Sequence, residues 1–238
     1  MKKKVVAYTL LLMLFSQTIS ANIDDGVTNP VTHYHQKKIS LIFDGGPSIQ
    51  TFRILDILKV ANIRATFFVT GQNTKKYPDI IYRIVKDGHT IGIRVPFETE
   101  SDYSTQKVFN EIISTSNAIY RLSGIDPVLI MPSNDNYKAH RLLKNFHTKG
   151  YTIVTYDLSL ENLHKEYVRD TTLKRIRNYL IVCQSELTTN GIADKAAHQN
   201  DLLPVLPQLI KVLKSNKFVF IDVQSITQTK LKGQKRNK

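Results

Sequence analysis

The stretch Ile39-Ser40-Leu41-Ile42-Phe43-Asp44-Gly45-Gly46-Pro47 is an apolar run that ends in a carboxylate and a Gly-Gly-Pro turn. An apolar run of this length, closed by glycine and proline, predicts a buried strand rather than a helix. Loops converge at the ends of parallel strands in α/β proteins, and chemistry is commonly found there. The stretch therefore places Asp44 where a catalytic carboxylate would lie; the alternative is a carboxylate that only caps the turn.

The chain on both sides of this stretch alternates between strand and helix patterns. Strands are predicted over 39–43, 64–71, 90–95, 128–131, 151–157, 179–183 and 218–223, and helices over 51–61, 77–87, 104–122, 139–149, 170–178 and 202–214. Repeated β–α units with apolar strands indicate an α/β protein with a parallel sheet covered by helices. Such a sheet can close into a barrel.

The two ends of the chain differ from this pattern. Residues 1–21 combine a basic start, an apolar run and small residues before a cleavage point, which predicts a signal peptide too short to anchor the chain in a membrane. We expect a flexible leader over 22–37, one folded domain over 38–226 and a basic disordered tail over 227–238. The predicted location is therefore secreted or periplasmic.

The 238-residue chain is strongly basic, with a formal net charge of +13. Removing residues 1–21 takes away three lysines and no acidic residue, so the mature chain would carry +10. Such a charge favours anionic partners, although basic exported proteins without an anionic partner are the alternative. No motif specific for nucleic acid accompanies the charge. The single cysteine, Cys183, lies in an apolar run and is predicted to be a buried thiol.

Four stretches, in this order and spacing, resemble the polysaccharide deacetylases, also called the NodB-homology domain: Ile42–Pro47, Leu55–Leu58, Ala65–Gly71 and Asp87–Gly92. The resemblance covers residues 38–223 and is closest in its first part. It implies a distorted (β/α) barrel of about seven parallel strands. It also implies metal-dependent removal of acetyl groups from chitin-like, peptidoglycan or related exported glycans.

The chemistry that the resemblance implies needs a divalent metal such as zinc, held by one carboxylate and two imidazoles. In this chain Asp44 corresponds to the separate Asp that acts as the base, but Gly45 stands at the position of the metal-binding carboxylate. The two histidine positions are Arg94 and Glu98. The resemblance therefore predicts no metal site and no cofactor here.

The remaining motifs differ in the same way. The motif expected as Arg-Pro-Pro-Tyr-Gly keeps only Pro132, and the histidine that would protonate the leaving amine corresponds to Gln184. His89 follows Gly88 as in the family and is expected to pack or form a hydrogen bond rather than bind a metal. Asp44 is thus predicted to be a remnant of the base. The positions predicted to line a substrate groove are Pro47, Arg94, Glu98, Pro132 and Gln184.

Arg94 leads to a further hypothesis. A guanidinium is a permanent cation and does not ligate metal ions. We predict that Arg94 projects into the space of the missing metal and faces Asp44, with Glu98 as a second candidate neighbour. A fixed cation there would replace the charge of the metal and keep Asp44 ionised, without lowering the pKa of a water as zinc does.

Two functions follow from these observations. The first is an exported, catalytically inactive homologue of the deacetylases that binds a glycan or an envelope partner. The alternative is a divergent hydrolase that removes acetyl groups from an N-acetylated polysaccharide or peptidoglycan, using Asp44 with Glu98, or with Asp135 and His198. The expected partner is a polysaccharide, peptidoglycan or an anionic envelope surface.

Overall fold

The computed structural model describes residues 37–96, 104–132, 143–156, 158–159, 179–185, 203–204 and 206–225. All of them belong to one unit of the chain, which starts at His35. The predicted signal peptide, most of the leader and the basic tail lie outside the described residues. None of the described helices is long and apolar enough to cross a membrane.

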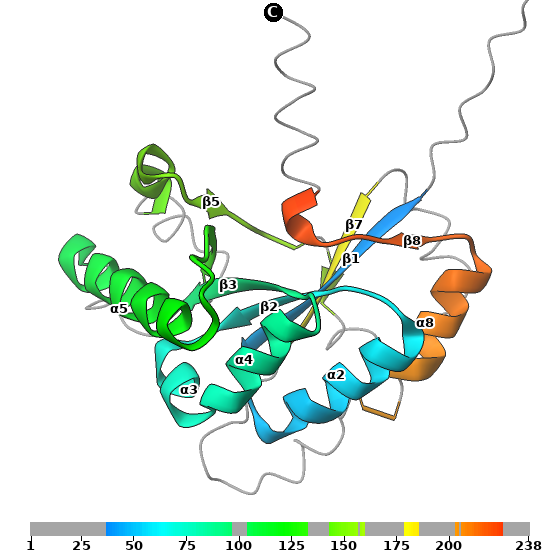
Figure 1. Ribbon diagram of the computed structural model, residues 1–238. Coiled ribbons are helices and arrows are strands. Elements are labelled where there is room, and N and C mark those ends of the chain that lie inside the picture. The colour runs from blue at the N-terminus through cyan, green and yellow to red at the C-terminus, as the bar shows by residue number, and fades with distance from the viewer. Residues whose placement is uncertain are drawn as a thin grey trace, which may run out of the picture. The chain divides into compact units, whose positions relative to one another are not determined.

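The described strands form one parallel sheet (Figure 1). They are β1 (Lys38–Gly46), β2 (Thr66–Val69), β3 (Thr90–Val95), β4 (Leu129–Pro132), β5 (Thr152–Ile153), β6 (Leu158–Ser159), β7 (Tyr179–Ser185) and β8 (Val219–Phe220). The order is β5-β4-β3-β2-β1-β7-β6, and β8 pairs with β1. Within the described residues no ladder joins β5 to β6, so the sheet is open rather than a closed barrel.

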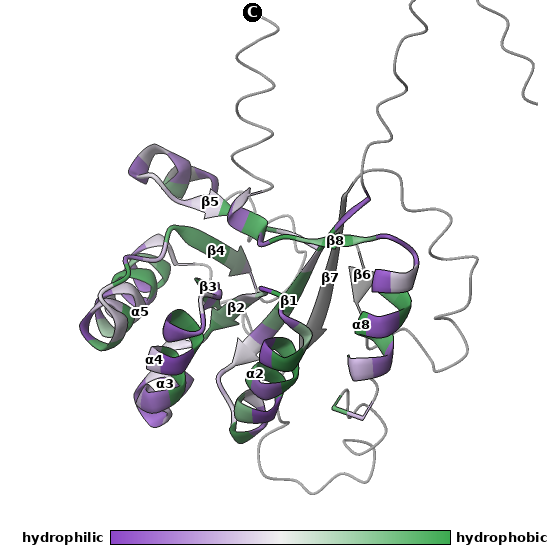
Figure 2. Cartoon of the chain, turned by 45° about the vertical axis from the view of Figure 1, so that its right-hand side comes forward, coloured by the Kyte–Doolittle hydropathy of each residue, from purple (hydrophilic) through white to green (hydrophobic). Residues whose placement is uncertain are grey.

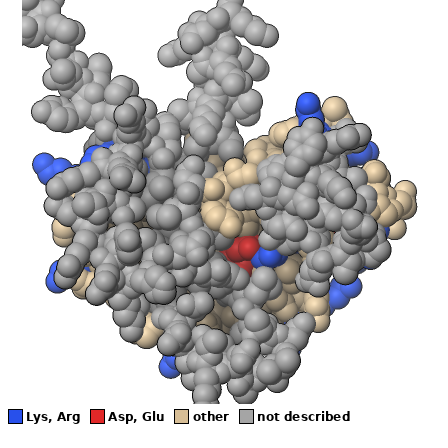
Figure 3. Space-filling view, turned by 180° about the vertical axis from the view of Figure 1, so that it is seen from behind, with Lys and Arg blue, Asp and Glu red and all other residues tan. Residues whose placement is uncertain are grey.

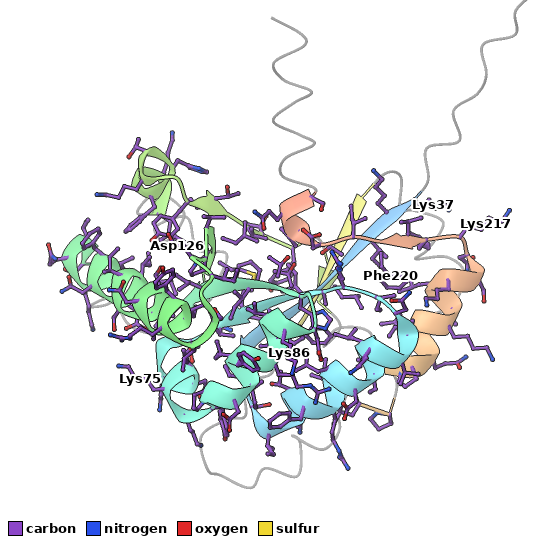
Figure 4. All side chains as sticks on the ribbon, in the orientation of Figure 1. Lys37, Lys75, Lys86, Asp126, Lys217 and Phe220 are labelled. Carbon is purple, nitrogen blue, oxygen red and sulfur yellow. The ribbon has the colours of Figure 1, made fainter. Side chains whose placement is uncertain are left out.

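Strand β1 is the centre of this sheet. Strand β7 pairs with it from Lys38 to Asp44 along one edge. Strand β8 takes the start of the opposite edge, at Lys38 and Ile39, and β2 takes its end, from Ile42 onward. Figure 4 shows Phe220 of β8 beside the start of β1, where the Val219 N–H donates to the carbonyl oxygen of Lys37 over 2.9 Å.

The helices lie along one side of the sheet (Figure 1). They are α2 (Ile49–Ala61), α3 (Gly71–Lys76), α4 (Pro78–Lys86), α5 (Thr105–Ser123) and α8 (Leu206–Ser215), with a 3-10 helix, η2, over Lys144–Lys149. Figure 2 shows that β2 and β4 are mainly hydrophobic, whereas the helices carry both hydrophobic and hydrophilic residues. This distribution is typical of helices that bury one face against a sheet.

The alternation of side chains along β1 separates two apolar clusters. Ile39, Leu41 and Phe43 belong to the large core that also includes residues from the helices. The intervening residues point to the opposite face, where the second cluster consists of Ile42, Phe68, Leu129, Met131, Val154 and Val223. This face is called the inner face below. Asp44 lies on it, two residues beyond Ile42, at the end of β1.

The structure confirms the parallel α/β arrangement and corrects several predicted elements. Helix α3 was not predicted, because its sequence GQNTKK contains no apolar stripe. The predicted helix 139–149 is a 3-10 helix in its described part. Of the predicted strand 218–223, only Val219 and Phe220 form a strand, β8, which pairs with β1.

The predicted strand 151–157 is also shorter in the structure. Strand β5 covers two of these residues, and a separate strand, β6, begins at Leu158. Strand β5 is short because only two residues of β4, Leu129 and Ile130, pair with it at this edge of the sheet. The predicted helix 170–178 lies outside the described residues.

Candidate functional site

The end of β1 is shaped by a β-bulge at Gly45. Asp44 pairs with Phe68 and Gly46 pairs with Val69, which leaves Gly45 as the extra residue. Its φ of 82° is one that glycine adopts readily and other residues rarely do. The Asn73 side chain of α3 donates a hydrogen bond of 2.8 Å to the Gly45 carbonyl oxygen. Helix α3 therefore holds the bulge that follows Asp44.

Arg94 reaches Asp44 from β3, the second strand away. In the ladder, Asp44 pairs with Phe68 of β2, and Phe68 pairs with Gly92 of β3, so Arg94 lies two residues beyond the row of Asp44. Its Nη1 donates to Oδ2 of Asp44, and the two charged groups form an ion pair. The side chains are only 8% and 10% exposed. The predicted juxtaposition of these two residues is present in the structure.

The ion pair borders the apolar inner face. Met131 is in register with Arg94, and Phe68 with Asp44; both are at most 1% exposed. Charges in such surroundings lose most of their hydration, so each requires a partner. Figure 3, seen from behind, shows an acidic and a basic side chain in contact near the centre of the view, while other basic side chains are scattered toward its edges.

His89 has a structural role, as expected. Its Nδ1 accepts a hydrogen bond of 3.2 Å from the Ala65 N–H, and its ring packs edge-on against Phe67 at 5.4 Å. Burial lowers the pKa of His89 to about 4. The imidazole is therefore neutral at neutral pH. It precedes the first residue of β3, whereas Asp44 is near the other end of the strands.

The two predicted proline positions lie next to these strand ends. Pro47 follows β1 through a cis peptide bond with Gly46. Pro132 is the last residue of β4, in register with Val95. Both prolines are buried and lie at the strand ends; that they line a substrate groove stays a prediction.

The remaining predicted positions are described only in part. Gln184 is in register with Phe43, one residue before the row of Asp44, and Ser185 occupies that row. Glu98, Asp135 and His198 lie outside the described residues. Of the predicted site residues, the structure therefore brings Asp44 and Arg94 into contact.

Two features of the site were missed in the sequence. One is Asn73, whose helix lacks an apolar pattern. The other is the close approach of Gly92 to Phe68, where a side-chain carbon added at Gly92 would lie 2.6 Å from the ring. The resemblance to the family singled out Gly92, but it did not indicate that Phe68 packs against it, because Phe68 belongs to another strand.

The residues that the structure describes at this site do not fit a divalent metal. Among the described residues, no group of three or more His, Cys, Asp or Glu side chains is placed to hold one. Gly45 has no ligand atom, and the carboxylate of Asp44 is already paired with a permanent cation. The described part of the site can present a neutralised carboxylate–guanidinium pair to a ligand, but it lacks the donors of a zinc site.

Comparison with known proteins is consistent with this fold. The family model for polysaccharide deacetylase matches residues 32–154. A peptidoglycan-N-acetylglucosamine deacetylase of Bacillus cereus is 28% identical over 202 residues, covering 82% of this chain and 70% of that protein. A second Bacillus cereus protein of the same description is 31% identical over 195 residues, covering 78% and 69%.

A solved structure agrees. The crystal structure of a peptidoglycan N-acetylglucosamine deacetylase in complex with 4-naphthalen-1-yl-N-oxidanyl-benzamide matches with a TM-score of 0.62 at 27% identity. The match covers 80% of this chain and 88% of that one. Since the family model spans more than half of the sequence and the solved relative shares the fold, the chain belongs to the polysaccharide deacetylase family.

Proposed function

We propose that this chain is an exported member of the polysaccharide deacetylase family that binds an envelope glycan without deacetylating it. The observation that carries the proposal is the buried ion pair between Asp44 and Arg94. A general base must accept a proton from water in the reaction. In this structure Oδ2 of Asp44 is instead engaged by the Arg94 guanidinium in a buried ion pair.

The neighbouring positions support the same proposal. Gly45 offers no atom to bind a metal, and its positive φ is unfavourable for the aspartate that the family pattern expects there. Arg94 can neither hold a metal nor take up a proton, because its guanidinium stays protonated. These two substitutions remove separate parts of the chemistry, yet the strands that carry them are intact.

The ligand class follows from the relatives and from charge. Two relatives are described as peptidoglycan-N-acetylglucosamine deacetylases, so peptidoglycan or a related N-acetylated glycan is the ligand we propose. The net charge of +10 expected for the mature chain suits the anionic polymers of a cell envelope. Pro47 and Pro132 would support the wall of the groove from within, and Arg94, Glu98 and Gln184 would lie along it.

Export rests on residues 1–21, proposed to be a cleaved signal peptide. N-terminal sequencing of the protein recovered outside the cytoplasm tests this directly. We expect a mature chain that begins near Ala21 or Asn22. An uncleaved Met1 would contradict it.

The decisive experiment measures acetate release and binding side by side. Purified protein is incubated with acetylated chito-oligosaccharides and peptidoglycan fragments, with zinc or cobalt added, and acetate is quantified. In parallel, co-sedimentation with insoluble peptidoglycan measures binding. We expect binding by the wild type, with no more acetate than an Asp44→Asn variant releases.

Two outcomes would contradict the proposal. Acetate release by the wild type that the Asp44→Asn variant lacks would favour the divergent hydrolase. Absence of binding to every glycan, by a protein whose circular dichroism shows it to be folded, would exclude a glycan-binding role.

A further inference from the structure

The ion pair at the end of β1 supports an inference that goes beyond the proposed glycan binding. Among the described residues, Asp44 supplies the carboxylate at the end of β1, and the Arg94 guanidinium is its partner. Both are on the inner face beside Phe68 and Met131, which are at most 1% exposed. A carboxylate in such a place needs a fixed positive charge. Here the charge comes from the chain itself.

The backbone next to Asp44 fits this arrangement. Gly45 occupies the bulge with a φ of 82°, and Asn73 holds its carbonyl oxygen. Glycine adopts such a φ more readily than an aspartate does. The change Gly45→Asp would restore a carboxylate that could bind a metal, but Arg94 would still face the carboxylate of Asp44.

The ladder explains why Arg94 can serve as the partner. Strand β2 separates β1 from β3, and Gly92 has no side chain in the row that it shares with Phe68 and Asp44. Arg94 is the next residue of β3 with the same orientation as Gly92. Its long side chain spans the width of β2 to reach Asp44.

We infer that Arg94 takes the place of a metal ion as the positive charge of this site, so that the site is assembled without any divalent cation. This inference goes beyond the proposed function. It holds whichever ligand the protein binds, and its tests use no glycan. A failure of glycan binding and a failure of this inference are therefore distinguishable.

The first test measures metal dependence of the full-length wild-type protein. Its metal content is determined by mass spectrometry, and urea unfolding is followed with zinc, with cobalt and with a chelator. A ligand that binds only the folded state raises the unfolding midpoint with its concentration. We expect no stoichiometric metal and the same midpoint in all three conditions. Stoichiometric zinc or cobalt that is lost in Asp44→Asn would overturn the inference.

The second test is a double-mutant cycle with Asp44→Asn, Arg94→Met and the combined variant. Each single change leaves one buried charge or one polar group without its partner, whereas the combined change removes both. We expect both single variants to unfold at lower urea concentration, and the double variant to lose clearly less than the sum of their losses. Additive losses would overturn the inference.

Two further variants serve as controls. Arg94→Lys keeps a cation at the same position, and we expect its midpoint to lie between those of the wild type and Arg94→Met. Arg83→Met removes a different arginine, which pairs with Asp56 over 2.5 Å and with Asp87 over 3.2 Å and is itself 25% exposed. We expect a smaller shift there, since solvent screens a partly exposed arginine more than the buried Arg94. If the single variants at Asp44 or Arg94 do not fold, the wild type still decides the question: an unfolding midpoint that rises with zinc or cobalt and falls with the chelator would overturn the inference.

Discussion

At the scale of single residues, two buried polar side chains, Arg94 and His89, are stabilised in opposite ways. The Arg94 guanidinium is a permanent cation, and the Asp44 carboxylate lies against it. His89 is held neutral, since burial lowers its pKa to about 4 while its Nδ1 accepts the Ala65 N–H. One side chain on β3 therefore carries the charge of the site, and the other, just before the strand, makes stability depend on pH.

His89 gives a prediction about acid stability. Its pKa is about 4 in the folded protein, against 6.5 as its ordinary value, so the unfolded chain binds the proton more readily. The contribution of neutral His89 is complete above pH 6.5 and is lost as the pH falls toward 4. The loss has a slope of at most ~1.4 kcal/mol per pH unit. Urea unfolding over this pH range measures it.

The matched control for this prediction is His89→Asn. Asparagine can offer its side-chain oxygen close to the position of Nδ1, and it does not titrate. We expect the variant to show a shallower decline of unfolding free energy between pH 6.5 and 4. An equal slope in both proteins would mean that His89 does not contribute.

At the scale of elements, the fit of β3 against β2 depends on Gly92. A side-chain carbon there would lie 2.6 Å from Cε1 of Phe68 and 3.1 Å from Cβ of Leu129. Phe68 is fully buried, so its ring has little room to move. We expect Gly92→Ala to lower the unfolding free energy by about 1–3 kcal/mol, the usual cost of overpacking a core. Urea denaturation provides the measurement.

A second background separates packing from backbone effects. Glycine within a strand is by itself slightly destabilising relative to alanine, so a loss in Gly92→Ala reports the collision with Phe68. The same change in a Phe68→Leu background should cost less. If the cost is the same in both backgrounds, the ring is not its cause.

Elements with a long, regular pattern were predictable, and short ones were not. Strand β3 (Thr90–Val95) agrees with the predicted range, and α5 (Thr105–Ser123) is shifted by one residue. Helix α3 depends on contacts instead. Thr70 caps its start by accepting the Asn73 N–H, and Gly71 lies so close to α5 that a side-chain carbon would be 2.5 Å from Oγ1 of Thr115. Such contacts come from other parts of the chain and leave no periodic pattern.

At the scale of the whole molecule, the C-terminal part of the chain completes the inner face. Strand β8 pairs with the start of β1, and the Val223 N–H donates to Oγ1 of Thr66 over 3.2 Å. Val223 is fully buried in the inner cluster, 157 residues away from Thr66 in sequence. Contacts of such sequence separation form only when the two ends of the domain come together.

This arrangement predicts the effect of changes near the C-terminus. Val223→Ala should lower the unfolding free energy by about 2 kcal/mol, the scale of a buried valine side chain. A chain that ends after Ser215 loses both β8 and Val223, and it should unfold at clearly lower urea concentration than the wild type. A chain that ends after Ile226 is the control, because it keeps both. Equal midpoints for the two truncated chains would contradict this account.

The sequence by itself determined the family, the parallel α/β fold and the place of Asp44 at the end of β1. It also showed that Gly45 and Arg94 stand where the family pattern has metal ligands. Each of these depends on a local run of residues or on a motif with fixed spacing, which a single chain displays directly. Sequence reasoning also proposed that Arg94 faces Asp44, but only through the family pattern.

Only the tertiary structure decided that these two side chains meet, although they are 50 residues apart and β2 runs between their strands. It also decided that Gly45 is a bulge with positive φ, that Phe68 covers Gly92 and that Val223 closes the inner face. The physical reason is that alternation within a strand specifies which face a side chain takes, whereas its neighbours depend on strand order and register. Those are properties of the assembled sheet.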